Sequence, residues 1–67
     1  MTARDFSDRF KPFLPVGRIA QEAGFLENTW YVAASRGRDL TEDELRRLRA
    51  AVEAHADTLR ELAADLT

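Results

Sequence analysis

Apolar side chains recur at three- and four-residue spacing along nearly the whole chain, which predicts an all-α protein. Phe6 and Phe10 lie one turn apart within residues 3–11. The helix they indicate ends before Pro12, because proline lacks the backbone N–H that a helix interior needs. Two short helical patterns and one long one follow. We therefore expect three short helices and then a long C-terminal helix.

Residues 15–37 contain the second and third short helices. Pro15 suits the first turn of a helix, where its missing N–H would be unpaired anyway. Gly24 stands where this helix stops and the chain must take a positive φ, and a second pattern around Trp30 stops at Gly37. Two short helices joined by a tight glycine turn form a helix-turn-helix, the unit that lays its second helix in the DNA major groove.

A capping box marks the start of the long helix. The Thr41 hydroxyl is placed to accept from the amide of residue 44, and the Glu44 side chain to reach back. Leu40 and Leu45 occupy the flanking hydrophobic-staple positions. No glycine or proline follows, so we expect one helix to the chain end, roughly 25 residues and nearly 40 Å long.

The apolar residues of this helix form a heptad stripe, as in a coiled coil. Residues 1–40, the predicted head, need only the start of so long a helix to cover them, so the stripe predicts a homodimer. The alternative is a bent or broken helix that folds back into one monomeric bundle. The direction of pairing stays open, although Arg49 and Asp65 could pair across an antiparallel seam. The predicted dimer interface is Leu48, Val52, His55, Leu59, Leu62 and Leu66.

The chain is thus divided into the head at residues 1–40 and a dimerisation helix at residues 41–67. The apolar positions that face one another in these patterns form the expected core. They are Phe6, Phe10, Leu14, Ile19, Ala20, Ala23, Phe25, Trp30 and Ala33, closed by Leu40 and Leu45.

The run Ile19-Ala20-Gln21-Glu22-Ala23-Gly24-Phe25, with Thr29-Trp30 after it, resembles the helix-turn-helix of Cro/cI-like and LacI-like repressors. That family has an apolar residue, a small one, two variable positions, a small one and glycine. Five residues later comes Thr or a similar residue, then a buried apolar one. The match covers about a third of the chain. Leu26 replaces the usual Ser or Thr cap, which favours a start of the second helix at Asn28, and Trp30 is larger than the usual Val or Ile.

The resemblance implies which residues would read DNA. Glu27 and Asn28 fall where such repressors place their first base-contacting side chains, and Val32 falls one turn later. Asn28 suits a bidentate contact to adenine, and Glu27 suits a cytosine amine. Tyr31 suits a phosphate or a thymine methyl group. The remaining candidates, for phosphate contacts, are Arg18, Thr29, Ser35, Arg36 and Arg38. The alternative is a solvated surface for the arginines and a helix-start charge for Glu27.

The net charge of −2 counts at first against nucleic acid, but the charge is unevenly distributed. Residues 1–38 carry six basic and four acidic side chains, whereas residues 39–67 carry four basic and eight acidic ones. Because phosphate binding depends on local positive charge, a basic head on an acidic helix remains compatible with DNA.

The residue inventory gives no argument for an enzyme. Without cysteine there is no disulfide or thiolate metal site, and His55 alone cannot build a metal centre. We expect His55 to be an interface residue, with a pH sensor at the dimer seam as the alternative. No phosphate-cradling glycine loop, signal peptide or membrane span is apparent. A cytoplasmic protein without metal, cofactor or small-molecule ligand is expected.

These features favour a sequence-specific DNA-binding transcriptional regulator, a homodimer that binds an inverted repeat in double-stranded DNA. By analogy it would be an autorepressor, as among small phage or mobile-element regulators, the anti-CRISPR-associated repressors included. The alternative is a protein-interaction module whose heptad helix binds a partner protein, which the acidic overall charge favours.

Overall fold

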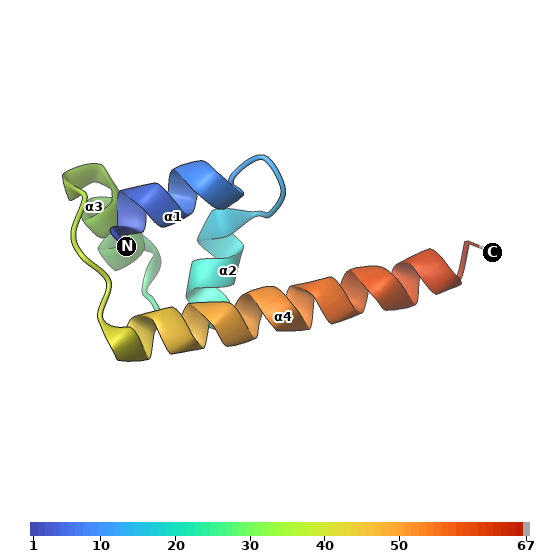
Figure 1. Cartoon of the computed structure of the whole chain (residues 1–67). Coiled ribbons are helices and arrows are strands. Elements are labelled where there is room, and N and C mark those ends of the chain that lie inside the picture. Colours follow the sequence, from blue (N-terminus) through green and yellow to red (C-terminus); the bar gives the residue numbers. More distant parts are fainter. Residues whose placement is uncertain (67) are drawn as a thin grey trace.

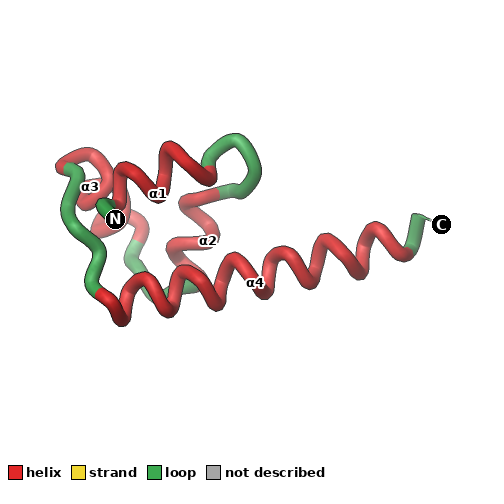
Figure 2. The backbone as a smooth tube through the Cα atoms, viewed as in Figure 1, coloured by secondary structure: helices red, strands yellow, loops and turns green. Residues whose placement is uncertain are grey.

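The chain folds into four α-helices, with no strand within residues 1–66, the part that this computed structural model describes (Figure 1). The helices are α1 (Ala3–Phe10), α2 (Val16–Glu22), α3 (Glu27–Arg36) and α4 (Glu42–Ala64). Short loops join them (Figure 2). No helix in this range has the length and apolarity needed to cross a membrane. The predicted fold class, three short helices followed by a long one, is confirmed.

The N-terminus forms a capping box that the sequence patterns left unnoticed. Thr2 accepts from the amide of Asp5, and the Asp5 carboxylate accepts from the amide of Thr2. Two backbone hydrogen bonds then tie this end to the α3–α4 connection: the amide of Ala3 donates to the carbonyl of Arg38 over 2.8 Å, and the amide of Leu40 donates to the carbonyl of Met1 over 3.0 Å. The first residues therefore hold α3 and α4 in place.

The helix-turn-helix consists of α2, a four-residue turn and α3. Gly24 takes a φ of 99°, as predicted, and Gly37, predicted as the end of the second helix, takes a φ of 63° as its C-cap. The predicted start of the second helix at Asn28 is wrong, because α3 begins at Glu27 with Leu26 as its N-cap. Leu26 makes no side-chain cap, but its extended backbone and its carbonyl, which accepts from the amide of Trp30, suffice to begin the helix.

Arg47 of α4 fastens the turn of the helix-turn-helix to the long helix. Its Nη1 donates to the carbonyl of Ala23 over 3.2 Å, and its guanidinium lies 5.8 Å from the ring centroid of Phe25. Asp43 holds the same guanidinium in an ion pair of 3.1 Å. The Arg47 side chain thus attaches the turn to α4.

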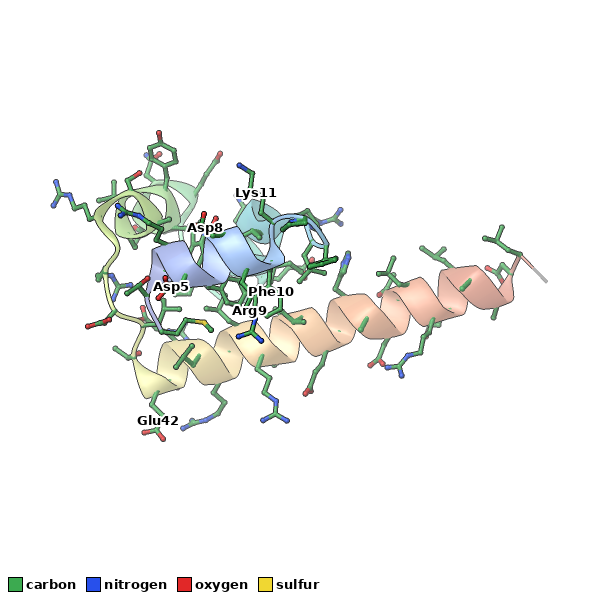
Figure 3. The ribbon with its side chains drawn as sticks, turned by 45° about the horizontal axis from the view of Figure 1, so that its top comes forward. Asp5, Asp8, Arg9, Phe10, Lys11 and Glu42 are labelled. Carbon is green, nitrogen blue, oxygen red and sulfur yellow. The ribbon has the colours of Figure 1, made fainter. Side chains whose placement is uncertain are left out.

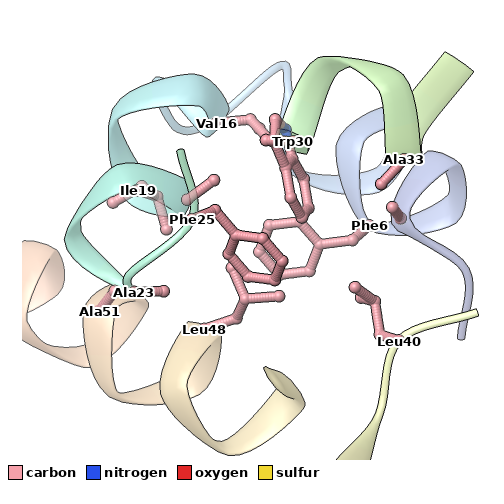
Figure 4. Packing of buried hydrophobic residues seen from close by; sticks show 12 residues of the cluster. Phe6, Val16, Ile19, Ala23, Phe25, Trp30, Ala33, Leu40, Leu48 and Ala51 are labelled. Carbon is pink, nitrogen blue, oxygen red and sulfur yellow. The ribbon is translucent and has the colours of Figure 1, made fainter. Parts of the chain in front are cut away.

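The core lies between the head and the first turns of α4 (Figure 4). Trp30 is its centre: its ring meets Phe6 and Phe25 edge-on, with centroid distances of 5.8 and 5.0 Å. Most of the predicted core is buried, although Phe10, Leu14 and Leu45 are only partly covered. Four buried residues were missed: Ala3, Val16, Leu48 and Ala51.

The capping box predicted at the start of α4 is present. The amide of Glu44 donates to the Thr41 hydroxyl over 3.1 Å, and Glu44 accepts from the amide of Thr41 over 2.9 Å. From there α4 runs without a break to Ala64 and projects past the head (Figure 1). The bent or broken helix is therefore ruled out.

The two ends of the predicted dimer stripe have different environments. Leu48 is fully buried in the core beneath α2 and α3, so its assignment to the dimer interface is wrong. Val52 is partly covered by the core, and His55 is half-buried. Leu59, Leu62 and Leu66 are 49%, 56% and 87% exposed. Only the second half of the stripe is left open to a partner.

Candidate nucleic-acid interface

One face of α3 is exposed and the opposite face anchors the helix. Asn28, Tyr31, Val32 and Ser35 follow one another at the three- and four-residue spacing of a single helix face, and all four are exposed. Trp30 is buried among aromatic rings on the other side. Because the large indole fixes the rotation of α3, the exposed face has one defined direction.

Five of the candidate DNA-binding residues lie together in a hollow of about 400 Å³ beside this face. They are Asn28, Thr29, Val32, Arg36 and Arg38, with the buried Ala33 below them. The hollow joins α3 to the start of the α3–α4 connection. It therefore combines an amide and an apolar side chain, which suit base edges, with two guanidiniums, which suit phosphates.

Tyr31 and Ser35 lie on the other flank of α3, next to α1. They line a hollow of about 340 Å³ with Arg4, Ser7 and Asp8 of α1. The Asp8 carboxylate is therefore a neighbour of this flank, and it opposes phosphate binding there. The two flanks of α3 consequently differ: the Arg36 side is basic, and the α1 side has mixed charge.

Arg38 has an intramolecular partner. Its Nη2 donates to the Glu44 carboxylate over 2.9 Å and its Nη1 over 3.2 Å. The Arg38 guanidinium, followed by the amide of Thr41, lowers the pKa of Glu44 to about 2. Part of the positive charge of Arg38 is therefore neutralised within the chain, and Glu44 also completes the cap of α4.

Arg36 is the better candidate for a phosphate contact. It is exposed in the last turn of α3, and within residues 1–66 its side chain takes part in no ion pair or hydrogen bond. A charged group without an intramolecular partner can neutralise a phosphate without first breaking another contact. Arg36 and Arg38 thus differ in availability although both line the same hollow.

Two candidates lie elsewhere or have a simpler role. Arg18 lines neither hollow beside α3; it pairs with Glu22 at 3.6 Å and lines a separate hollow with His55 and Leu59 of α4. The structure therefore does not bring Arg18 together with the other candidates. Glu27 is the first residue of α3, where a negative charge is favoured by the helix dipole. This position agrees with its helix-start alternative.

Arg4 is a positioning residue that the sequence analysis missed. Its Nε donates to the carbonyl of Ala34 over 3.3 Å, and its Nη2 donates to the carbonyl of Ser35. These are carbonyls of the last turn of α3, where few intrahelical donors remain, and that of Ala34 also accepts from the amide of Gly37. Because Arg4 and Ser35 are 31 positions apart, no local pattern could have indicated the contact.

Together, the fold and this surface define a small all-α protein whose helix-turn-helix presents one anchored, exposed helix face. Comparison with known proteins gives no match: no protein-family model, curated protein or solved structure is significantly similar to the chain.

Proposed function

We propose that the chain is a sequence-specific DNA-binding transcriptional regulator. The observation that carries the proposal is the exposed face of α3, which presents Asn28, Val32 and Arg36 together. Trp30, buried on the opposite side, fixes the rotation of this helix. A helix of ten residues, α3 has the length of a recognition helix that enters a major groove.

In this proposal α3 lies in the major groove and each side chain has its own role. Asn28 contacts adenine through its amide, and Val32 packs against a thymine methyl group. Thr29, Arg36 and Arg38 contact the flanking phosphates, and Tyr31 and Ser35 contact the backbone on the side of α1. Arg4 acts only through α3, because its guanidinium is occupied by the last carbonyls of that helix.

The regulator acts in the cytoplasm as a homodimer, with each α3 facing one half of an inverted repeat. The homodimer is supported by the exposed Leu59 and Leu62 in the second half of α4 and by Leu66 after it, none of which belongs to the apolar core of residues 1–66. By analogy with small phage and mobile-element regulators, its action is autorepression.

The test is selection from a pool of random duplexes, followed by sequencing of the bound fraction and titration at several salt concentrations. We expect an enriched palindrome and a steep loss of affinity with salt. Arg36→Ala should lower the salt slope by about one unit per subunit. Arg60→Ala, an exposed arginine far along α4, is the matched control and should leave the slope unchanged. No enriched sequence at low salt would contradict the proposal.

Asn28→Ala separates base reading from backbone contact. We expect it to relax the sequence preference at one position, at a cost of about 1–3 kcal/mol for the preferred base. An equal loss on all duplexes would show that Asn28 contacts phosphate.

The second candidate function is a protein-interaction module that uses α4. The exposed Leu59, Leu62 and Leu66 favour it, because they would suit an apolar helix of another protein. A salt-independent response to duplex DNA, with no enriched sequence, would support this candidate over DNA binding.

A further inference from the structure

An apolar groove runs between α1 and the first half of α4. It has a volume of about 320 Å³, and its lining includes Met1, Phe10, Leu45, Arg49, Val52 and Glu53. Three of these side chains pack against the core but are only partly buried: Phe10, Leu45 and Val52. The end of α1, with Phe10 and Arg9, is shown in Figure 3. The groove is thus an uncovered extension of the core of the head.

Two arginines and one glutamate lie at the rim of this groove. Arg49 lines it directly, and the Arg9 guanidinium lies 5.9 Å from the ring centroid of Phe10. Arg49 also pairs with Glu53 at 3.1 Å, but both side chains are well exposed. Because exposed ion pairs contribute little, Arg49 can exchange Glu53 for another carboxylate at low cost.

The tail, residues 53–66, consists of the second half of α4 and the two residues that follow it. Leu59 continues the seven-residue spacing of Leu45 and Val52 along one side of α4. Leu66 comes seven residues after Leu59 but lies beyond the end of the helix at Ala64. Ala56 and Ala63 lie beside them and leave room for a second helix to approach closely. Asp65, adjacent to Leu66, is the acidic side chain next to this stripe.

Charge decides the direction in which two such helices can pair. Residues 45–52 carry three arginines and no acid, whereas residues 57–66 carry three acids and one arginine. A parallel pair would align each segment with its own copy and place like charges together. An antiparallel pair aligns the basic segment of one chain with the acidic segment of the other, which favours this direction. Arg46 and Arg47 already pair with Asp43, and Asp57 with Arg60, so Arg49 and Asp65 contribute most of this preference.

We propose that a second copy of this chain occupies the groove: the two α4 helices pair antiparallel, and each tail lies in the groove of the other head. Leu59 of one chain covers Val52 of the other, Leu66 reaches Leu45 and Phe10, and Asp65 lies about one helical turn from Arg49. The interface deepens the proposed function, on whose homodimer it rests, by naming the surface that each copy contributes.

This arrangement also sets the distance between the two α3 helices. Five residues, 37–41, connect α3 to α4, so α3 lies near the start of the long helix (Figure 1). With the pair centred near residue 56, the two starts of α4 lie about 40 Å apart along the helix axis. That separation is close to the one DNA turn, about 34 Å, that divides the half-sites of helix-turn-helix dimers.

Sedimentation of the full chain without DNA tests the interface. We expect a dimer for the wild type and an increase of more than about tenfold in the dimer Kd for Leu59→Asp, which places a charge in the seam. Ala50→Asp adds the same charge on the opposite side of α4 and should leave the Kd within about twofold. A monomeric wild type, or equal effects of the two substitutions, would overturn the proposal.

Cysteine cross-linking tests the direction, and it is clean because the chain contains no cysteine. An oxidised mixture of the Arg49→Cys and Leu62→Cys chains should give a disulfide-linked heterodimer, because the two positions lie at the same level of the antiparallel pair. Leu62→Cys alone should give none, because the two copies of this position lie about 20 Å apart along the helix axis. Efficient cross-linking of Leu62→Cys with itself would show parallel pairing and overturn the proposal.

These readouts contain no DNA, so they separate the interface from the proposed function. A cross-linked antiparallel dimer that enriches no duplex would uphold the interface and contradict DNA binding. A monomer that enriches a single half-site would do the reverse.

Discussion

The two halves of α4 have similar apolar patterns, but the first half is buried against the head and the second half is exposed. Residues 42–52 pack Leu48 and Ala51 into the core of the head, and Leu48 is 0% exposed. Residues 53–66 carry leucines at the same helical spacing, but Leu62 is 56% exposed. The difference teaches that helical periodicity marks which face of a helix is apolar and does not say what covers that face.

The physical reason for the difference is the size of the head. About three turns of a helix, roughly 16 Å, suffice to lie across α2 and the core, and the molecule measures 43 Å along its longest axis. Every turn beyond the head keeps its apolar face exposed until another chain covers it. The tail is therefore where association can occur and the first half is where folding is decided.

The sharpest test of this comparison is a pair of leucine truncations. Leu48→Ala should lower the free energy of unfolding by about 2–5 kcal/mol, because it leaves a cavity in the core. Leu62→Ala should change the unfolding free energy of the isolated chain by less than about 0.5 kcal/mol. Urea titration at a protein concentration below the dimer Kd measures both. Equal effects would mean that the tail is also part of the folded core.

Glycine substitutions test how the turn is held against the first half of α4. Gly24→Ala should destabilise the chain by about 1–3 kcal/mol, because alanine is strained at a φ of 99°. Its Cβ would also lie 2.9 Å from Nη1 of Arg47, which must then release the carbonyl of Ala23.

Gly17→Ala is the matched control for that substitution. Gly17 lies within α2, and a Cβ there meets nothing within 4 Å. We expect a gain of roughly 0.5–1 kcal/mol in thermal or urea unfolding, since alanine favours the helix. A loss at Gly17, or a gain at Gly24, would contradict the described geometry of the helix-turn-helix.

The smallest expected effect concerns pH. The folded pKa of Glu44, about 2, lies below the ordinary value of a glutamate, so its ion pair with Arg38 stabilises the fold at neutral pH. That contribution is lost as the pH falls from about 5 towards 2, when the carboxylate becomes protonated. Urea titration should show that the wild type loses about 1 kcal/mol more over this range than Glu44→Gln does.

Glu61→Gln provides the control in the tail. Glu61 is exposed and lies beyond the head, so the pH dependence of unfolding should match that of the wild type. If Glu44→Gln and Glu61→Gln behaved alike, the Arg38–Glu44 pair would not contribute to acid stability.

Elements with local signals were predicted well. The two glycine turns, the capping box at Thr41 and the unbroken long helix each depend on residues within one or two turns of one another, so the sequence pattern contains them. The anchoring of α3 by Trp30 was predicted too, because its face is set by helical spacing. The start of α3 at Glu27 was missed, since a helix can begin without a side-chain cap when the backbone of Leu26 already has the required conformation.

Contacts between distant parts of the chain could not be predicted in this way. Three hydrogen bonds depend on where whole helices lie: from Arg4 to the last turn of α3, from Arg47 to the turn before α3, and from Arg38 to Glu44. The same holds for the candidate site: the sequence proposed its residues, but only the packed helices separate the Arg36 flank from the α1 flank and move Arg18 away.

The sequence by itself determined the four helices, their turns and the apolar face of each, because those follow from backbone preferences and short-range spacing. Only the tertiary structure decided that Leu48 belongs to the core and Leu59 to an open surface. It also decided that the Arg36 side chain has no partner within residues 1–66, and that an apolar groove with arginines at its rim lies beside α1. Burial depends on what else arrives at a face, and that is a property of the packed chain.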